Sequence, residues 1–252
     1  TGIEMMLAVD VSNSMLAQDF EPSRLERTKF AIDRLTQQLE QDRIGLIVFA
    51  GDAYMQLPIT SDYVAARSFA AQISPTMVSK QGTAIGAAID LAASSFSSGS
   101  EGSRVVVVIS DGENHEDDAL AAAKAAAEKG IRIYTIGIGT PEGAPISIDG
   151  EFIKDEQGDM VVSKLDEQML EQIALTTGGA YIRATNRSLG LDEIVQNINE
   201  VEKKELTSTV FEDFNEQYQY LIGLALALLL LEFAMLERRS RLLARFNIFR
   251  KR

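Results

Sequence analysis

The sequence predicts an α/β fold, a doubly wound, mostly parallel sheet with helices on both faces, followed by a C-terminal transmembrane helix. Residues 5–9 and 105–109 are unbroken apolar runs, as expected of strands that helices cover on both sides. Such runs alternate along the chain with segments of helical periodicity, which is typical of a parallel sheet. Residues 218–236 form a longer apolar run, which predicts the membrane helix.

The elements are expected in regular alternation after the first strand. Residues 22–41 predict a helix, because Leu25, Ile32 and Leu35 form an apolar stripe. Residues 54–57 predict a short antiparallel strand at one edge of the sheet. The other expected helices are residues 62–73, 84–96, 119–129, 166–177 and 188–200, and the other expected strands are residues 43–51, 131–138 and 178–184.

Length and composition set the domain organisation. The 252 residues, 46% of them hydrophobic, suffice for one α/β domain with chain left over, and we expect this domain over residues 1–200. Residues 146–162 interrupt the alternation with glycine-containing turns, which predicts a small β-hairpin insertion. The absence of cysteine excludes disulfides and thiol catalysis. Because Thr1 is not an initiator methionine, we expect the chain to be part of a longer one.

Oxygen-bearing side chains follow the first predicted strand. Asp10, Ser12 and Ser14 stand at alternate positions where this strand emerges at its carboxyl end, which is where open α/β sheets bind ligands. Hard oxygen donors without nearby Cys or His suit Mg²⁺ or Mn²⁺. The alternative is an ordinary strand-to-helix loop, since Asp, Ser and Asn are also common capping residues.

Two further stretches favour the metal site. Thr83 opens a helical pattern within Gly82-Thr-Ala-Ile-Gly86, and Asp111 follows the strand at 105–109. The order Asp-x-Ser-x-Ser, then Thr, then Asp-Gly resembles the metal-ion-dependent adhesion site of von Willebrand factor A domains, whose fold is Rossmann-like. The resemblance implies that Ser12, Ser14 and Thr83 touch the metal, with Asp10 and Asp111 behind or beside them.

Three nearby residues are weaker candidates. His115, the only histidine, is four residues past Asp111 but has no paired nucleophile, so a solvated loop position is expected. Glu113 and Glu116 are near enough to tune the site, yet we expect them to serve the first turn of the following helix.

The charges divide the chain into an acidic body and a basic tail. Residues 1–237 carry 17 basic and 37 acidic residues, a formal charge of −20, which excludes nucleic acid as a partner. Seven basic residues lie in the tail, residues 237–252, directly after the apolar run. Residues 201–217 are expected to be a charged linker.

The apolar run is long enough to span a bilayer. Nineteen helical residues, 218–236, reach roughly 28 Å, close to a hydrocarbon core of roughly 30 Å. Glu232 opposes this prediction, and a buried core helix is the alternative. By the positive-inside rule the basic tail is cytoplasmic, which predicts a bacterial inner membrane protein with its domain in the periplasm.

Longer stretches of the sequence resemble one particular group of von Willebrand A proteins. The stretches Asp19-Phe-Glu-Pro-Ser-Arg-Leu-Glu-Arg27, Asp42-Arg-Ile-Gly-Leu-Ile-Val-Phe-Ala-Gly51, Gln81-Gly-Thr-Ala-Ile-Gly86 and Ser110-Asp-Gly-Glu-Asn-His-Glu116 resemble the Bat (Bacteroides aerotolerance) membrane proteins, particularly the BatB type. That resemblance implies two kinds of partner, other Bat-type von Willebrand A membrane proteins and a MoxR-type AAA+ ATPase.

Three functions are compatible with these features. The leading hypothesis is a non-enzymatic, metal-dependent module that captures an Asp or Glu of a partner protein. A Mg²⁺-dependent phosphohydrolase is the rival, but haloacid dehalogenase-type enzymes need a second Asp two residues after the first, where this chain has Ser12. The third is a purely structural assembly subunit whose metal only holds the loops.

Overall fold

The structure is a computed structural model that describes residues 2–39, 41–96, 103–114, 116–148, 150–200 and 218–237. Residues 1–200 and 201–252 form two separate compact units. The first unit contains a six-stranded sheet in the order β10-β5-β4-β1-β2-β3. Its strands are β1 (Glu4–Asp10), β2 (Arg43–Phe49), β3 (Ala53–Thr60), β4 (Arg104–Ser110), β5 (Arg132–Gly137) and β10 (Tyr181–Arg183).

The predicted mostly parallel sheet is confirmed. β1 pairs in parallel with both β2 and β4, with Val9 opposite Val48 on one side and Ile109 on the other. Within the six strands of this sheet, only β3 is antiparallel to its neighbour, and its pairing with β2 contains register shifts around Leu46. The edge strand is therefore longer than the predicted 54–57, and it contains Pro58.

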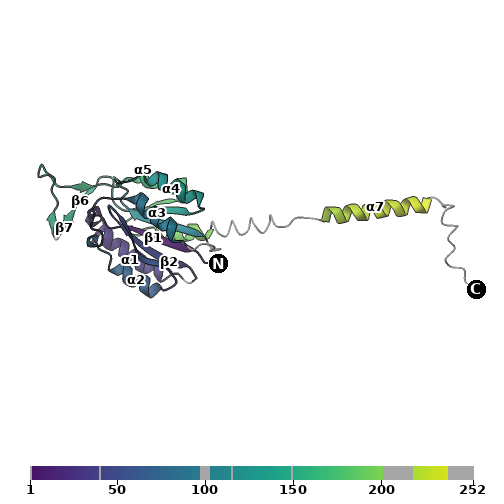
Figure 1. The fold of residues 1–252 in the computed structure, drawn as a ribbon, viewed down its shortest axis with the longest axis horizontal. Helices are drawn as coiled ribbons and strands as arrows, with labels where there is room; N and C mark the ends of the chain where they lie inside the picture. The colour runs from purple at the N-terminus through teal and green to yellow at the C-terminus, as the bar shows by residue number, and fades with distance from the viewer. Residues whose placement is uncertain are drawn as a thin grey trace, which may run out of the picture. The chain divides into compact units, whose positions relative to one another are not determined.

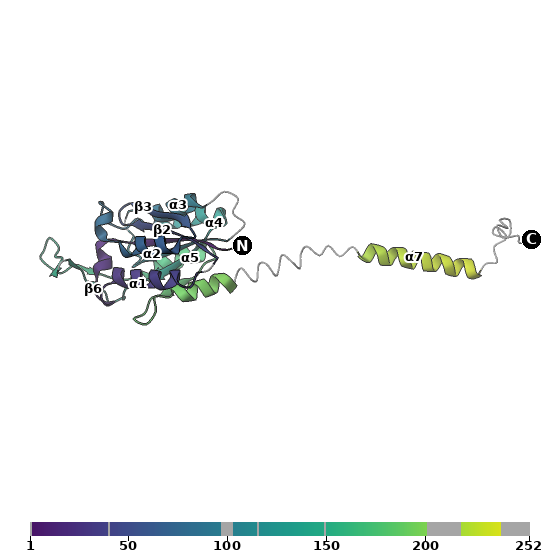
Figure 2. The same ribbon diagram turned by 90° about the horizontal axis from the view of Figure 1, so that it is seen from below.

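Helices cover both faces of the sheet (Figures 1 and 2). One face packs against α1 (Arg24–Thr36), α2 (Tyr63–Ala71) and a helix at residues 191–200, and the other against α3 (Ile85–Ser95), α4 (Ala119–Glu128) and α5 (Glu167–Thr176). Met5, Leu7 and Val9 of β1 face the first layer, whereas Met6 and Ala8 face the second. Burial on both faces explains why the strand carries no polar alternation.

Several predicted boundaries are wrong by a few residues. The first helix ends at Thr36 rather than at residue 41, and it begins after Ser23, whose hydroxyl accepts the Glu26 N–H (3.2 Å). The last strand covers only Tyr181–Arg183, shorter than the predicted 178–184. The predicted helix at 188–200 starts at residue 191, because Gly190 adopts a φ of +90°, which ends the preceding turn.

Residues 144–163 form small two-stranded pieces that project from the sheet (Figure 1). β6 (Ala144–Pro145) pairs with β9 (Val162–Ser163), and β7 (Ser147–Ile148) pairs with β8 (Glu151–Phe152). A further bridge joins Lys154 and Met160.

The second unit contains the helix α7 (Tyr218–Glu237). Its described leucines are exposed, at 57–64% of their full accessible surface. Over the described residues, no helix is found that is long and apolar enough to cross a membrane, so the predicted span at residues 218–236 is not confirmed and stays a prediction. The predicted linker, 201–217, and the tail beyond residue 237 lie outside the described residues.

Candidate metal centre

Two buried aspartates meet at the carboxyl edge of the sheet. Asp10 ends β1 and Asp111 directly follows β4, so the parallel pairing of these strands brings both carboxylates to one place. Both side chains are fully buried. Ser110, between them, donates a hydrogen bond from its Oγ to Asp10 Oδ2 (2.6 Å) and accepts the Gly112 N–H (3.0 Å).

The loop after β1 places both serines beside Asp10. Asp10 Oδ1 accepts the backbone N–H of Ser12 (2.8 Å), which fixes the start of the loop. The chain then enters a short 3₁₀ helix at Asn13–Leu16, and this turn brings the Ser14 hydroxyl to 2.8 Å from the Ser12 hydroxyl. The structure thus brings Asp10, Ser12 and Ser14 together as predicted.

Thr83 lies on a third loop that is tied to the first. The side chain of Gln81 accepts the N–H of Asn13 (3.2 Å), and the Ala84 N–H bonds to the carbonyl of Ala50 at the end of β2 (2.7 Å). Thr83 is buried, 4% exposed, yet its hydroxyl has no hydrogen-bond partner among the described residues. This unpaired hydroxyl is not sealed from solvent, so it is open to a ligand such as a metal ion.

Arg24 is the functional residue that sequence reasoning missed. This arginine is fully buried at the first turn of α1. Its Nη1 donates to Asp111 Oδ2 (3.0 Å) and to the Ser163 hydroxyl (2.8 Å), which in turn donates to Asp111 Oδ2 (2.9 Å). Its Nε and Nη2 donate to the two carboxylate oxygens of Asp19 (2.8 and 2.7 Å). One guanidinium therefore joins two carboxylates from separate loops.

The spacing of the buried residues along α1 could have identified Arg24 from the sequence. Arg24, Thr28, Ile32 and Leu35 recur at intervals of four, four and three residues, and all four are buried. A cation on the buried stripe of a helix needs a buried anion, because an unpaired buried charge is costly. The partners themselves are 87 and 139 residues away in sequence, so spacing could not name Asp111 or Ser163.

The charges of this cluster do not balance. The carboxylates of Asp10, Asp19 and Asp111 face one guanidinium, which leaves a formal charge of −2. Burial, with the negative charge of Asp111 as the second cause, raises the pKa of Asp10 to about 7, although hydrogen bonds from Ser110 and Ser12 act to lower it. For Asp19, burial acts to raise the pKa, but the hydrogen bonds and charge of Arg24 outweigh it and hold this pKa below its usual range.

The loop after Asp111 anchors neighbouring elements. Gly112 has a φ of +81°, and a Cβ there would meet the Asp166 carbonyl oxygen at 2.3 Å. This close approach allows the Asp166 N–H to bond to the Asp111 carbonyl (2.8 Å). Asn114 and Asp117 accept the first N–H groups of α3, in place of a side-chain cap from Ala84.

The predicted roles of the two glutamates are wrong. α4 is capped by Asp118, so neither Glu113 nor Glu116 serves its first turn. Glu113 instead accepts the Lys164 N–H (3.0 Å), and Glu116 pairs with Lys80 (2.7 Å). His115 lies outside the described residues.

The sequence model of the von Willebrand factor type A domain matches residues 4–198. The chain belongs to the von Willebrand factor type A family. The predicted BatB resemblance is confirmed by two solved structures. An aerotolerance-related membrane protein from Bacteroides fragilis is 51% identical, with a TM-score of 0.76, over 79% of this chain and 100% of that one. BatB from Bacteroides thetaiotaomicron is 48% identical, with a TM-score of 0.75 and the same coverage.

A more distant structure shares the fold alone. Proximal thread matrix protein 1 from the mussel byssus, described with a zinc-occupied adhesion motif, is 16% identical. The match covers 80% of this chain and 46% of the mussel protein chain, with a TM-score of 0.58.

Proposed function

We propose that this chain is a membrane-anchored, metal-dependent protein-binding module. A Mg²⁺ or Mn²⁺ ion held by Asp10, Ser12, Ser14, Thr83 and Asp111 would capture an aspartate or glutamate of a partner protein. The observation that carries this proposal is the formal charge of −2 on a buried cluster, which one divalent cation would neutralise.

The chemistry of the donors fits such an ion. Carboxylate and hydroxyl oxygens suit Mg²⁺ and Mn²⁺. Among the described residues, no group of three or more His, Cys, Asp or Glu is arranged to hold a metal, so hydroxyl oxygens are needed to complete a site. The side-chain oxygens of Asp10 and Asp111 already accept protein hydrogen bonds, which supports a position behind the three hydroxyls.

A binding role is favoured over hydrolysis. A phosphohydrolase of the haloacid dehalogenase type would need Asp10 as a free nucleophile and an acid two residues later. Here both oxygens of Asp10 are engaged by Ser12 and Ser110, and position 12 is a serine whose hydroxyl lies against Ser14. The proposal is therefore a non-enzymatic one.

The similarity to BatB supports a place in a membrane assembly. One solved relative is described as an aerotolerance-related membrane protein, and it shares about half of its residues with this chain. We propose other Bat-type von Willebrand A proteins and a MoxR-type AAA+ ATPase as partners, with the acid-capturing site as the contact point.

Partner capture tests the metal role. We expect Ser12→Ala and Thr83→Ala each to reduce, by about tenfold, the partner recovered with the full-length protein from detergent-solubilised membranes of its host, as a chelator should in the wild type. Thr176→Ala on α5 is the matched control, because its hydroxyl bonds to a carbonyl of its own helix (2.7 Å). Quantitative mass spectrometry measures the recovery. Undiminished capture by both variants would leave the metal, if bound, a purely structural role.

We also propose that residues 218–236 anchor the protein in the bacterial inner membrane. The support is the 19-residue apolar run within α7, with seven basic residues after Glu237 and none between 205 and 237. The von Willebrand A domain would then be periplasmic and the tail cytoplasmic.

Protease protection in spheroplasts tests this orientation. Added protease should digest residues 1–200 and spare an epitope tag placed after Arg252, because moving seven cations across the bilayer is far costlier than leaving them inside. Detergent-permeabilised cells are the control, in which the tag should be lost. A tag cleaved in intact spheroplasts beside a protected domain would reverse the orientation.

A further inference from the structure

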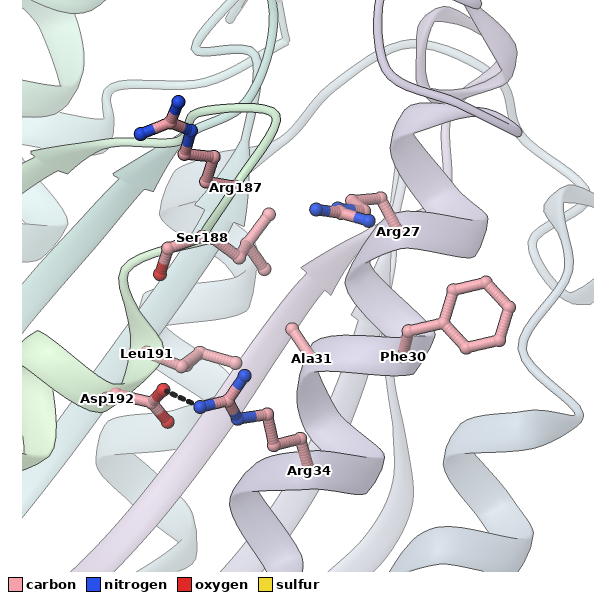
Figure 3. A pocket seen from close by; sticks show the side chains of 9 residues that line it. Arg27, Phe30, Ala31, Arg34, Arg187, Ser188, Leu191 and Asp192 are labelled. Carbon is pink, nitrogen blue, oxygen red and sulfur yellow. Dashed lines mark ion pairs between the residues drawn. The ribbon is translucent and has the colours of Figure 1, made fainter.

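A cavity lies away from the aspartate cluster, between α1 and residues 187–192 (Figure 3). Its volume is about 180 Å³. Three arginines line it, together with one acid and two leucines: Arg27, Arg34, Arg187, Asp192, Leu189 and Leu191.

The sequence places the arginines around this cavity by helix spacing and by one turn. Arg27 and Arg34 are seven residues apart and so lie on one face of α1, beside the buried stripe that contains Arg24. The turn at residues 185–190 brings Arg187 opposite them, and Arg27 donates a hydrogen bond to the carbonyl of Asn186 within this turn. Figure 3 shows Arg27 and Arg34 reaching from α1 toward the residues of this turn and the helix after it.

The cavity carries a positive charge on an acidic domain. Arg34 pairs with Asp192 (3.2 Å), with side chains 69% and 32% exposed, and within the described part of the chain neither Arg27 nor Arg187 makes an ion pair. Three guanidinium groups against one carboxylate leave a formal charge of +2. Residues 1–200 as a whole contain 15 basic and 30 acidic residues, so this patch is opposite in sign to its surroundings.

The residues that line this cavity indicate which class of ligand it can bind. Guanidinium groups present pairs of donors that match carboxylates, and Arg34 already holds one from Asp192. Leu189 and Leu191, which are 4% and 3% exposed, give the cavity an apolar floor that a lone small anion would not use. About 180 Å³ corresponds to roughly six water volumes, enough for one or two side chains.

We propose that this cavity binds a short acidic segment of a partner protein in which Asp or Glu alternates with an apolar residue. The site is separate from the metal centre. Arg24, on the same helix, points into the buried aspartate cluster, whereas the cavity uses guanidinium groups and no metal ligand. Binding here therefore does not depend on the proposed capture by a metal ion.

Fluorescence anisotropy tests the proposal. The probe is the fluorescein-labelled peptide Glu-Leu-Asp-Leu-Glu-Leu, and the protein is the full chain in detergent micelles with a chelator present. The wild type should bind this peptide, and Arg34→Gln/Arg187→Gln should weaken binding about fivefold or more. Raising the salt from about 0.05 to about 0.5 M should weaken it as well. Arg67→Gln on α2 is the control, since it removes one arginine charge elsewhere on the domain, and it should leave the dissociation constant within about twofold.

Three results would overturn the proposal. They are no binding beyond that of empty micelles, an equal loss with Arg67→Gln, or displacement of the peptide by inorganic phosphate at an equal concentration, which would assign the cavity to a simple anion. Ser12→Ala should bind the peptide normally. Loss of binding at the metal centre can therefore be distinguished from loss of peptide binding at this cavity.

Discussion

Replacing Arg24 by glutamine should lower the free energy of unfolding of the von Willebrand A domain by about 3–5 kcal/mol. The variant leaves Asp111 and Asp19 without their cation, and both Arg24 and Asp111 are fully buried. Removing one member of a buried ion pair is costly because the remaining charge stays desolvated. Urea denaturation of residues 1–200, the unit with its own core, measures the change.

Arg34→Gln is the matched control on the same helix. Arg34 also pairs with an aspartate, but its side chain is 69% exposed, so its loss should cost less than about 1 kcal/mol. Arg24→Lys should fall between the two, because a single ammonium group cannot reach both Asp19 and Asp111 as the forked guanidinium does. Equal, small effects of Arg24→Gln and Arg34→Gln would show that the buried network does not stabilise the fold.

The second large effect is a pH dependence that Mg²⁺ should remove. The pKa of Asp10 is raised to about 7 in the folded protein, against 3.8 in the unfolded chain, so the folded state binds this proton more tightly. In metal-free protein, the stabilisation from Asp10 is complete below about pH 4. It should be lost as pH rises to about 7, by up to about 4 kcal/mol. Mg²⁺ favours the ionised carboxylate, so it should raise the melting temperature more at pH 8 than at pH 6.

Asp10→Asn isolates this contribution. The variant cannot ionise at position 10, so its melting temperature should vary less between pH 4 and 7 than that of the wild type, and Mg²⁺ should no longer raise it. Asp90→Asn, an exposed position on α3, should behave as the wild type. Thermal unfolding of the two variants and the wild type, with and without Mg²⁺, measures these melting temperatures. A full Mg²⁺ response in Asp10→Asn would mean that the ion binds elsewhere.

The core of the fold was predictable because its strands are buried on both faces. The apolar runs at 5–9 and 105–109 contain no polar residue, and the structure places them side by side as β1 and β4. Asp10 and Asp111 could be predicted to meet because they end these strands. Helix ends were less predictable. Ser23, a capping residue three positions before Glu26, marks the true start of α1 better than the apolar stripe does.

The network behind the aspartates could not be read from the chain. Ser163 contacts Asp111 only because residues 144–163 fold back to the sheet edge, and Arg24 contacts both through tertiary packing. Local periodicity contains no information on such pairings. The strand order likewise could not be derived from the sequence alone, since alternation of strands and helices is compatible with more than one order.

The two outer strands of the sheet affect how the domain behaves when crowded. β3 pairs irregularly with β2 and contains Pro58, which lacks a backbone donor, and the opposite edge strand, β10, is only three residues long. A regular row of free N–H and C=O groups is what templates aggregation, and both edges lack one. Copies held at high local density should therefore resist fibril-like growth through their sheets, which leaves loops and helices free to make reversible contacts.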